Sequence, residues 1–188
     1  MHARTLVATT AHVALAASLV AAWSVITSAQ REHARPDLSG RWTLNRELSE
    51  SAEAKLDRLH STQSSGHGPG RHGGAGGRGE MEDLRRVLLT PAAWLTLTVD
   101  GDRIVITDSD GQVRRLSASG QKERVGGRDV RTKWDGDRLV LEAAWGMATV
   151  IDTYERAADG ARMTVTTTVD VSGQIVTVRR VYDLASSR

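Results

Sequence analysis

The feature that most constrains this chain is a two-residue alternation of apolar and polar side chains, which runs from Pro91 almost to the C-terminal end. In the segment 163–169, for example, Met163, Val165 and Val169 fall on one face, and the intervening threonines Thr164, Thr166 and Thr168 fall on the other. A period of two sends successive side chains to opposite faces of a β-strand. The pattern therefore predicts strands that bury one face.

Asp-Gly pairs separate these runs at residues 100–101, 110–111, 135–136 and 159–160. Glycine supplies the positive φ angles of tight hairpin turns, which join antiparallel neighbours. The expected strands are residues 38–44, 94–99, 103–107, 113–118, 129–134, 138–143, 148–154, 163–169 and 175–182. Closure of such a meander removes its free edges. We predict an all-β fold, an antiparallel up-and-down barrel of about eight or nine strands.

One short amphipathic helix is expected after the first strand. Asn45 offers an N-cap, and the apolar residues that follow it recur at helical spacing up to about residue 59. These residues are Leu48, Ala52, Leu56 and Leu59. Because only one face of this helix is apolar, we expect it to lie against one end of the barrel.

Residues 61–79 are mostly Gly, Ser, His and Arg, and they bury too little apolar surface to offset backbone entropy. We interpret them as a disordered loop of the domain. Residues 80–89 can add one or two helical turns, which Pro91 ends. The loop histidines His60, His67 and His72 could gather around a transition metal, but a Gly-rich chain does not fix their geometry, and a solvated spacer is favoured.

The segment Asp108-Ser-Asp-Gly111 has oxygen ligands at alternate positions, as calcium loops do. It lacks the downstream bidentate carboxylate of such loops, so a hairpin turn is favoured. The sequence contains no Cys, which excludes disulfides, thiolate metal sites and a cysteine nucleophile. We predict neither a metal nor a cofactor.

Residues 1–29 have the features of a secretory signal peptide. Arg4, with no acidic residue nearby, precedes an apolar stretch at residues 13–26, and small side chains lead to a cleavage point after Ala29. An uncleaved membrane anchor is the alternative, because residues 6–26 approach the length of a bilayer span. We expect a periplasmic or secreted protein that contacts a membrane only through this leader, if it is not cleaved.

Residues 30–188 are then expected to form a single domain. The 25 Lys and Arg residues nearly balance the 23 Asp and Glu residues, so no block of positive charge indicates a nucleic-acid partner. Outside the cytoplasm, ATP and reduced nicotinamide cofactors are not supplied, which disfavours an energy-coupled enzyme.

Gly40-Arg41-Trp42 opens the first expected strand and resembles the opening motif of lipocalins. The chain resembles secreted bacterial proteins with a lipocalin-like, calycin-type β-barrel. The likeness covers residues 37–184 and rests also on residues 133–140, 152–155 and 179–183. It implies a barrel closed by Gly40 and Trp42, with Arg179 or Arg180 stacked on Trp42 by cation–π attraction. It implies no particular ligand.

Our leading hypothesis is an exported barrel that binds a small hydrophobic or amphipathic molecule without transforming it. Trp94, Trp134 and Trp145 lie at or near strand ends, where indoles can line the mouth of a barrel, although core packing is the alternative. An inward Arg179 would select an anionic ligand. The alternative for it and for other strand cations, such as Arg131 and Lys133, is that they face solvent.

Two other functional classes remain open. A barrel of about eight strands can be filled by side chains, which would leave a cell-envelope interaction or structural module without a small ligand. A hydrolase or isomerase would need luminal carboxylates, for which Asp152, Glu155 and Asp183 are candidates, but their spacing singles out no acid and base. We predict no catalytic residues.

Overall fold

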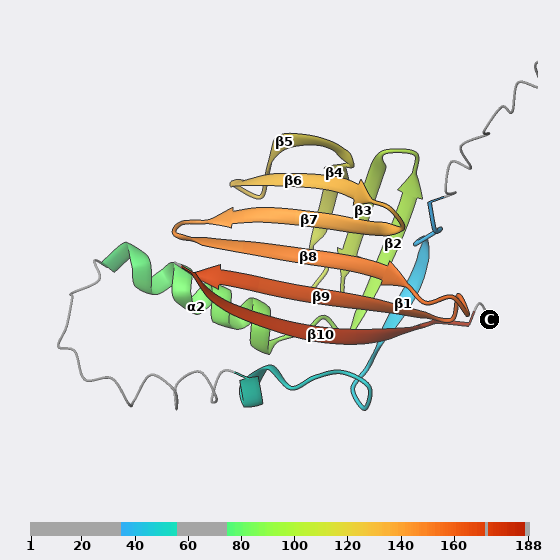
Figure 1. Ribbon diagram of the computed structural model, residues 1–188, viewed down its shortest axis with the longest axis horizontal. Coiled ribbons are helices and arrows are strands. Elements are labelled where there is room, and N and C mark those ends of the chain that lie inside the picture. Colours follow the sequence, from blue (N-terminus) through green and yellow to red (C-terminus); the bar gives the residue numbers. More distant parts are fainter. Residues whose placement is uncertain (1–34, 56–74, 172, 187–188) are drawn as a thin grey trace, which may run out of the picture. The chain divides into compact units, whose positions relative to one another are not determined.

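The computed structural model describes residues 35–55, 75–171 and 173–186. Ten strands within these segments form one antiparallel sheet (Figure 1). They are β1 (Gly40–Asn45), β2 (Trp94–Asp100), β3 (Arg103–Asp108), β4 (Val113–Ser117), β5 (Ser119–Val125), β6 (Arg128–Asp135), β7 (Arg138–Trp145), β8 (Ala148–Arg156), β9 (Arg162–Val171) and β10 (Gln174–Leu184). The predicted signal peptide, residues 1–29, lies outside the described residues.

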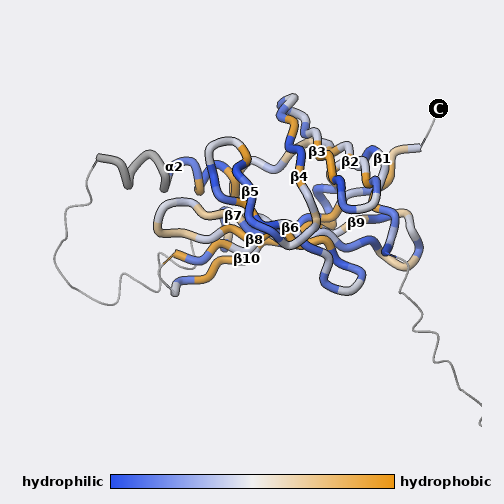
Figure 2. Tube along the Cα trace, turned by 90° about the horizontal axis from the view of Figure 1, so that it is seen from above, coloured by the Kyte–Doolittle hydropathy of each residue, from blue (hydrophilic) through white to orange (hydrophobic). Residues whose placement is uncertain are grey.

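The sheet curls into a near-closed up-and-down barrel, as predicted. The strand order is β4-β3-β2-β1-β10-β9-β8-β7-β6-β5, so the first strand pairs with both the second and the last. On β1, Trp42 lies opposite Leu95 of β2 and Leu184 of β10. The strands β4 and β5 stand at the two ends of this order and are joined through Ala118. The alternation of side chains appears in Figure 2 as repeated changes between orange and blue along the strands.

The strand count of about eight or nine was too low, because β5 was not predicted. Its sequence, SGQKERV, has polar residues on both faces and gives no two-residue pattern. Pairing holds it in the sheet instead: Lys122 to Val125 pair with β6, and the register shifts between Ser119 and Lys122. The strand adopts its conformation because of its neighbour, which propensity alone does not indicate.

A helix follows the first strand, but it does not begin at Asn45. One helical turn starts at Ala52, and the Oγ of Ser51 caps it by accepting the N–H of Ala54 at 3.3 Å. The Oδ1 of Asn45 instead accepts the N–H of Leu48 at 3.1 Å and stabilises a turn. The remainder of the predicted helix, residues 56–59, lies outside the described residues.

A second helix, α2 (Ala75–Leu89), is longer than the one or two turns predicted for residues 80–89. It begins inside the segment that we expected to be a disordered loop, so that expectation was wrong for residues 75–79, while residues 61–74 lie outside the described residues. Burial against the barrel stabilises α2, since Leu84 and Leu88 are almost fully buried. No helix in the described segments is long and apolar enough to cross a membrane.

Inward-facing side chains form two hydrophobic clusters. The first, which we call the Trp42 cluster, consists of Leu38, Trp42, Leu95, Leu97, Ile104, Ile106, Leu116, Ala118, Val130, Leu139, Leu141, Tyr154, Met163, Val165 and Tyr182. The α2 cluster packs the helices onto β8, β9 and β10 and consists of Ala52, Leu84, Leu88, Ala148, Val150, Val169 and Val178. The buried side chains of the barrel thus form two separate groups, one within the barrel wall and one between the helices and the strands β8 to β10.

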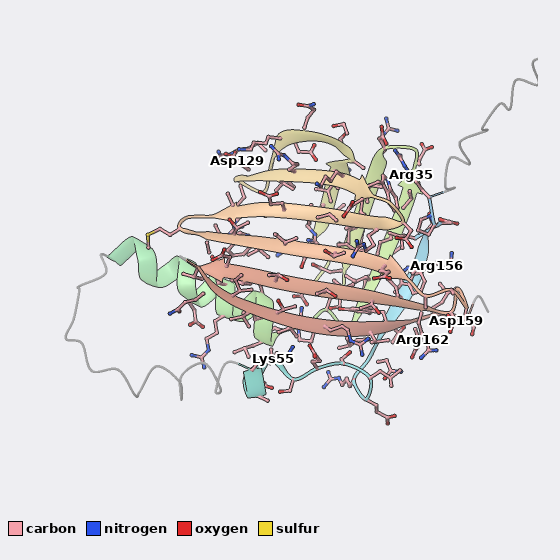
Figure 3. All side chains as sticks on the ribbon, viewed as in Figure 1. Arg35, Lys55, Asp129, Arg156, Asp159 and Arg162 are labelled. Carbon is pink, nitrogen blue, oxygen red and sulfur yellow. The ribbon has the colours of Figure 1, made fainter. Side chains whose placement is uncertain are left out.

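Trp42 is fully buried, and its Nε1 donates to the carbonyl oxygen of Leu38 at 3.0 Å. The guanidinium that stacks on its ring belongs to Arg156, with Cζ 5.6 Å from the ring centroid, and not to Arg179 or Arg180 as expected. Arg156 ends β8 close to the turn that carries Asp159 (Figure 3). The difference arises because Arg180 is turned into the barrel and Arg179 toward solvent.

Gly40 is required where the chain enters β1, since its φ is +140° and a Cβ there would lie 2.9 Å from Cδ1 of Leu184. We expect Gly40→Ala to lower the free energy of unfolding by about 1–3 kcal/mol, measured by urea denaturation. Gly101→Asn is the matched control, because Gly101 has a left-handed φ of +58° that asparagine tolerates, and no atom lies within 4 Å of the position that a Cβ would take there. Equal losses in the two variants would contradict the requirement for glycine at position 40.

Candidate ligand-binding site

The barrel contains a partly open cavity of about 320 Å³, which is lined by residues of both hydrophobic clusters. Its walls come from the strands β2 to β10 and from the C-terminal end of α2. The lining residues are Val87, Thr90, Pro91, Ala92, Leu95, Asp108, Gln112, Arg114, Leu116, Val125, Gly126, Arg128, Val130, Leu141, Ala143, Trp145, Val150, Asp152, Tyr154, Val165, Thr167, Arg180 and Tyr182. A volume of this size lies at the lower end of the range for small-molecule sites.

Aliphatic side chains make up much of the wall. Leu95, Leu116, Val130, Leu141 and Val165 all belong to the Trp42 cluster and also line the cavity. These side chains offer an apolar surface that a hydrocarbon group can contact in place of water. The cavity therefore has the lining of a site for a molecule with a substantial apolar part.

A group of polar side chains interrupts this apolar wall, and we call it the arginine cluster. It consists of Arg114, Asp152, Tyr154, Thr167, Arg180 and Tyr182. Nη2 of Arg114 donates to the Tyr154 hydroxyl at 3.4 Å, and the Oγ1 of Thr167 donates to Oδ1 of Asp152 at 2.7 Å. Nη1 of Arg114 lies 3.9 Å from Oδ2 of Asp152, which is ion-pair distance but longer than a hydrogen bond.

Arg180 connects this cluster to the helix. Its side chain is 7% exposed, and Nη2 donates to the carbonyl oxygens of Val87, at 3.1 Å, and Leu88. These carbonyls belong to the last turn of α2, where helical backbone acceptors have no partner within the helix. Tyr182 lies two residues further along β10, and its hydroxyl donates to the carbonyl oxygen of Ala92 at 3.3 Å. Arg180 therefore fixes the end of α2 to the cavity wall.

Burial sets the protonation of the two phenols. Desolvation raises the pKa of Tyr154 to about 12, although the neighbouring Arg114 guanidinium opposes the shift. Desolvation also raises the pKa of Tyr182, again against the attraction of Arg180. The pKa of Arg114 is raised, chiefly by the phenolic oxygen of Tyr154 and also by Asp152. At neutral pH the cluster therefore contains neutral phenols and charged guanidinium groups.

These shifts predict a loss of stability at alkaline pH. The folded-state pKa of Tyr154 lies near 12, and its ordinary value is 10.0. The contribution of protonated Tyr154 to the free energy of unfolding is therefore complete below pH 10 and is lost as the pH rises through 12. We expect the free energy of unfolding, measured by urea denaturation, to fall over this window with a smaller slope in Tyr154→Phe. An unchanged slope in that variant would contradict the assignment.

Hydrogen-bond donors exceed acceptors in the arginine cluster. A guanidinium carries five N–H groups, and in both Arg114 and Arg180 the Nε and Nη1 atoms have no hydrogen-bond partner within the part of the chain that the structure describes. The lining contains three cations, Arg114, Arg128 and Arg180, and two carboxylates, Asp108 and Asp152, and Arg128 is also paired with Asp83 of α2. An anionic group would supply the acceptors that Arg114 and Arg180 lack.

Arg128 and Trp145 mark one side of the cavity near the β5–β6 turn. The Cζ of Arg128 lies 3.6 Å from the centroid of the Trp145 ring, and its Nη2 lies 3.6 Å from Oδ2 of Asp83 on α2. Stacking and pairing thus join the barrel to the helix beside Gly126, where the lining is formed by backbone. Both side chains are half-buried, so they are available to a ligand that enters at this side.

Of the predicted binding residues that the structure describes, Trp145 lines the cavity and the others do not. The Arg41 guanidinium stacks on the Trp94 ring, with its Cζ 4.2 Å from the ring centroid. Trp134 packs against the Trp42 cluster, and its buried Nε1 has no hydrogen-bond partner within the described segments. Arg179 is exposed, and its backbone N–H donates to a carboxylate oxygen of Glu50 at 2.7 Å. Arg131 and Lys133 are exposed as well.

The candidate carboxylates do not converge. Asp152 lines the cavity, but Glu155 is exposed, and Asp183 accepts the side-chain N–H of Asn45 at 2.8 Å. Within the described ranges no group of three or more His, Cys, Asp or Glu residues could hold a metal ion. The loop histidines His60, His67 and His72 lie outside the described residues.

The segment at residues 108–111 is a turn, as favoured. Oδ1 of Asp108 accepts the backbone N–H groups of Asp110 and Gln112 at 3.1 and 2.9 Å, and Gly111 has a φ of +77°. Asp108 and Gln112 of this turn also line the cavity, and this role was not predicted.

Sequence reasoning missed Arg114, Tyr154 and Tyr182 as site residues. A signal was present, because each shares the inward face of its strand with a buried residue: Arg114 lies two positions from Leu116, Tyr154 four from Val150, and Tyr182 two from Arg180. Arg114 precedes the buried Leu116 by two positions and so shares its face. The pattern of the strand thus distinguishes Arg114 from its outward neighbour Arg115.

Comparison with known proteins yields only distant likenesses. No family model matches the chain, and no curated protein matches it. Among solved structures, the chain is similar to zebrafish ileal bile acid-binding protein complexed with cholic acid, at 15% identity and a TM-score of 0.46 over 78% of this chain and 98% of that one. It is also similar to the fatty acid binding protein of Schistosoma mansoni in complex with arachidonic acid, at 18% identity and a TM-score of 0.44 over 79% and 96% of the two chains.

A further similar structure is a variant of the fluorescent protein UnaG, at 16% identity and a TM-score of 0.47, covering 80% of this chain and 97% of that one. Likenesses at this level do not assign a ligand or a reaction. The function of this chain is therefore inferred from the residues that line its cavity.

Proposed function

We propose that this protein binds a small amphipathic anion, such as a medium-chain carboxylate, inside its barrel and does not transform it. The apolar part of the ligand lies against the aliphatic wall, beside Leu95, Leu141 and Val165. Its anionic group accepts hydrogen bonds from Arg114 and Arg180, which line the same cavity. The ligand is of modest size, because about 320 Å³ lies at the lower end of the range for small-molecule sites.

The observation that carries this proposal is the pair of guanidinium groups, Arg114 and Arg180, beside the aliphatic wall of the cavity. The Nε and Nη1 donors of Arg114 and Arg180, which have no hydrogen-bond partner among the described residues, match an anionic acceptor better than a cation or a neutral alkyl chain. The cavity also favours this proposal over a filled barrel that serves only as an envelope module. A hydrolase or isomerase with paired carboxylates is disfavoured, since Asp152, Glu155 and Asp183 do not converge.

The test is isothermal titration calorimetry with three ligands that share one chain length: decanoate, decanol and decylamine. We expect decanoate to bind about tenfold or more tightly than the other two, because only its head group accepts charge-assisted hydrogen bonds. Equal affinity for all three would overturn the anion selectivity. Absence of binding by decanoate, together with tight binding of decylamine, would overturn the proposed ligand class.

We also propose that the protein is exported from the cytoplasm and that its signal peptide is cleaved. Export is supported by Arg4, by the apolar stretch at residues 13–26 and by the small residues that end at Ala29. Expression of the full chain in a bacterial host, followed by fractionation and N-terminal sequencing, tests it. We expect a mature N-terminus at Gln30 in the periplasm or medium. An intact N-terminus in the cytoplasm would contradict export.

A further inference from the structure

Asp152 is the one member of the arginine cluster whose side chain only accepts hydrogen bonds when it is ionised. Its Oδ1 is satisfied by Thr167 at 2.7 Å. Its Oδ2 has no hydrogen bond in the described segments, because the facing Nη1 of Arg114 lies 3.9 Å away. The carboxylate is 15% exposed, and it lines the cavity, so a ligand can reach this oxygen.

Oδ2 of Asp152 lies next to the proposed anion site, because Arg114 belongs to that site. A ligand oxygen that accepts from Nη1 of Arg114 and a ligand donor that reaches Oδ2 of Asp152 must lie close together, since the two protein atoms are 3.9 Å apart. Both ligand groups therefore belong to one head group. A carboxylate alone would face Asp152 with like charge, whereas a hydroxyl beside it would donate to Oδ2 and remove that conflict.

We infer that Asp152 makes the cavity selective for anions that carry a hydroxyl next to the anionic group, in the manner of a 3-hydroxy carboxylate. This inference rests on the proposed function, because it concerns the head group of the same ligand. Arg114 and Arg180 bind the carboxylate, and Oδ2 of Asp152 accepts the hydroxyl proton in a hydrogen bond. Thr167 holds the carboxylate of Asp152 in the required orientation through Oδ1.

The experiment compares decanoate with 3-hydroxydecanoate by isothermal titration calorimetry on the full chain. We expect the wild-type protein to bind the hydroxylated ligand about tenfold more tightly, as one hydrogen bond to a charged acceptor allows. In Asp152→Ala we expect the two dissociation constants to agree within about threefold, with decanoate bound at least as tightly as before. Asp152→Leu keeps a similar side-chain size, has no hydrogen-bonding group, and serves if Asp152→Ala does not fold.

Glu155→Gln is the matched control, because Glu155 is an exposed carboxylate on the same strand, β8. It should retain the wild-type preference. If the wild-type protein binds both ligands equally, or if Asp152→Ala or Asp152→Leu keeps the preference, the role of Asp152 is overturned while the proposed function stands. If neither ligand binds the wild-type protein, the proposed function is overturned as well.

Discussion

Trp42→Ala is expected to lower the free energy of unfolding by about 3–5 kcal/mol, which is a large part of the stability of a domain of this size. The ring is fully buried and belongs to the Trp42 cluster, so its removal leaves a cavity among the packed side chains. The carbonyl oxygen of Leu38 loses the N–H that it accepts, and Arg156 loses its stacking partner. Urea denaturation followed by circular dichroism measures the change.

Trp94→Ala provides the matched control for this prediction. Trp94 belongs to β2 and is only half-buried, with Arg41 stacked on its ring at 4.2 Å. Its truncation should cost about 1–2 kcal/mol, since part of the ring already contacts water. A loss for Trp42→Ala no greater than that for Trp94→Ala would show that Trp42 does not anchor the closure of the barrel.

Arg114→Met is expected to weaken the binding of decanoate by about 10-fold to 100-fold, the range for loss of a hydrogen bond to a charged group. Methionine keeps much of the length of the side chain and removes its donors and charge. We expect β4 to keep its place in the sheet in this variant, because Leu116 of the same strand still packs in the Trp42 cluster. Isothermal titration calorimetry measures the affinity.

Arg115→Met removes the same chemical group from the next position of β4. Arg115 is exposed, so this variant changes the net charge of the protein equally without changing the cavity. We expect its affinity for decanoate to remain within about twofold of the wild-type value. A comparable loss in both variants would mean that general charge, and not the cavity, attracts the ligand.

The hairpins were predictable because their information is local. Gly101, Gly111, Gly136 and Gly160, which follow aspartates, all have positive φ angles in the structure, between +58° and +77°. The alternating runs between them became strands that pair with their neighbours in sequence. Turn chemistry and periodicity therefore sufficed for the antiparallel meander.

The misassigned elements depend on contacts that the local sequence does not contain. The strand β5 is polar except for Val125 at its end, and its pairing with β6 holds it in place. The helix α2 begins in the Gly-rich residues 75–79, and its end is fixed by Leu88 in the α2 cluster and by Arg180 of β10. Tertiary packing overrides weak helix propensity in this segment.

The binding site was only partly predictable for a related reason. Alternation could separate Arg180 from Arg179, because Arg180 shares its face with the buried Val178 and Tyr182. It could not show that Arg180 would donate to the carbonyls of α2, or that Arg114 and Asp152 from distant strands would meet. Such meetings depend on the register of the closed barrel, which a single sequence does not specify.

The most direct test of the central claim is a crystal structure of the protein with decanoate that carries a terminal bromine atom. We expect bromine anomalous density against the aliphatic wall, and the carboxylate within about 3.5 Å of a guanidinium nitrogen of Arg114 or Arg180. A barrel interior filled by side chains, or a ligand bound only on the outer surface, would contradict the claim.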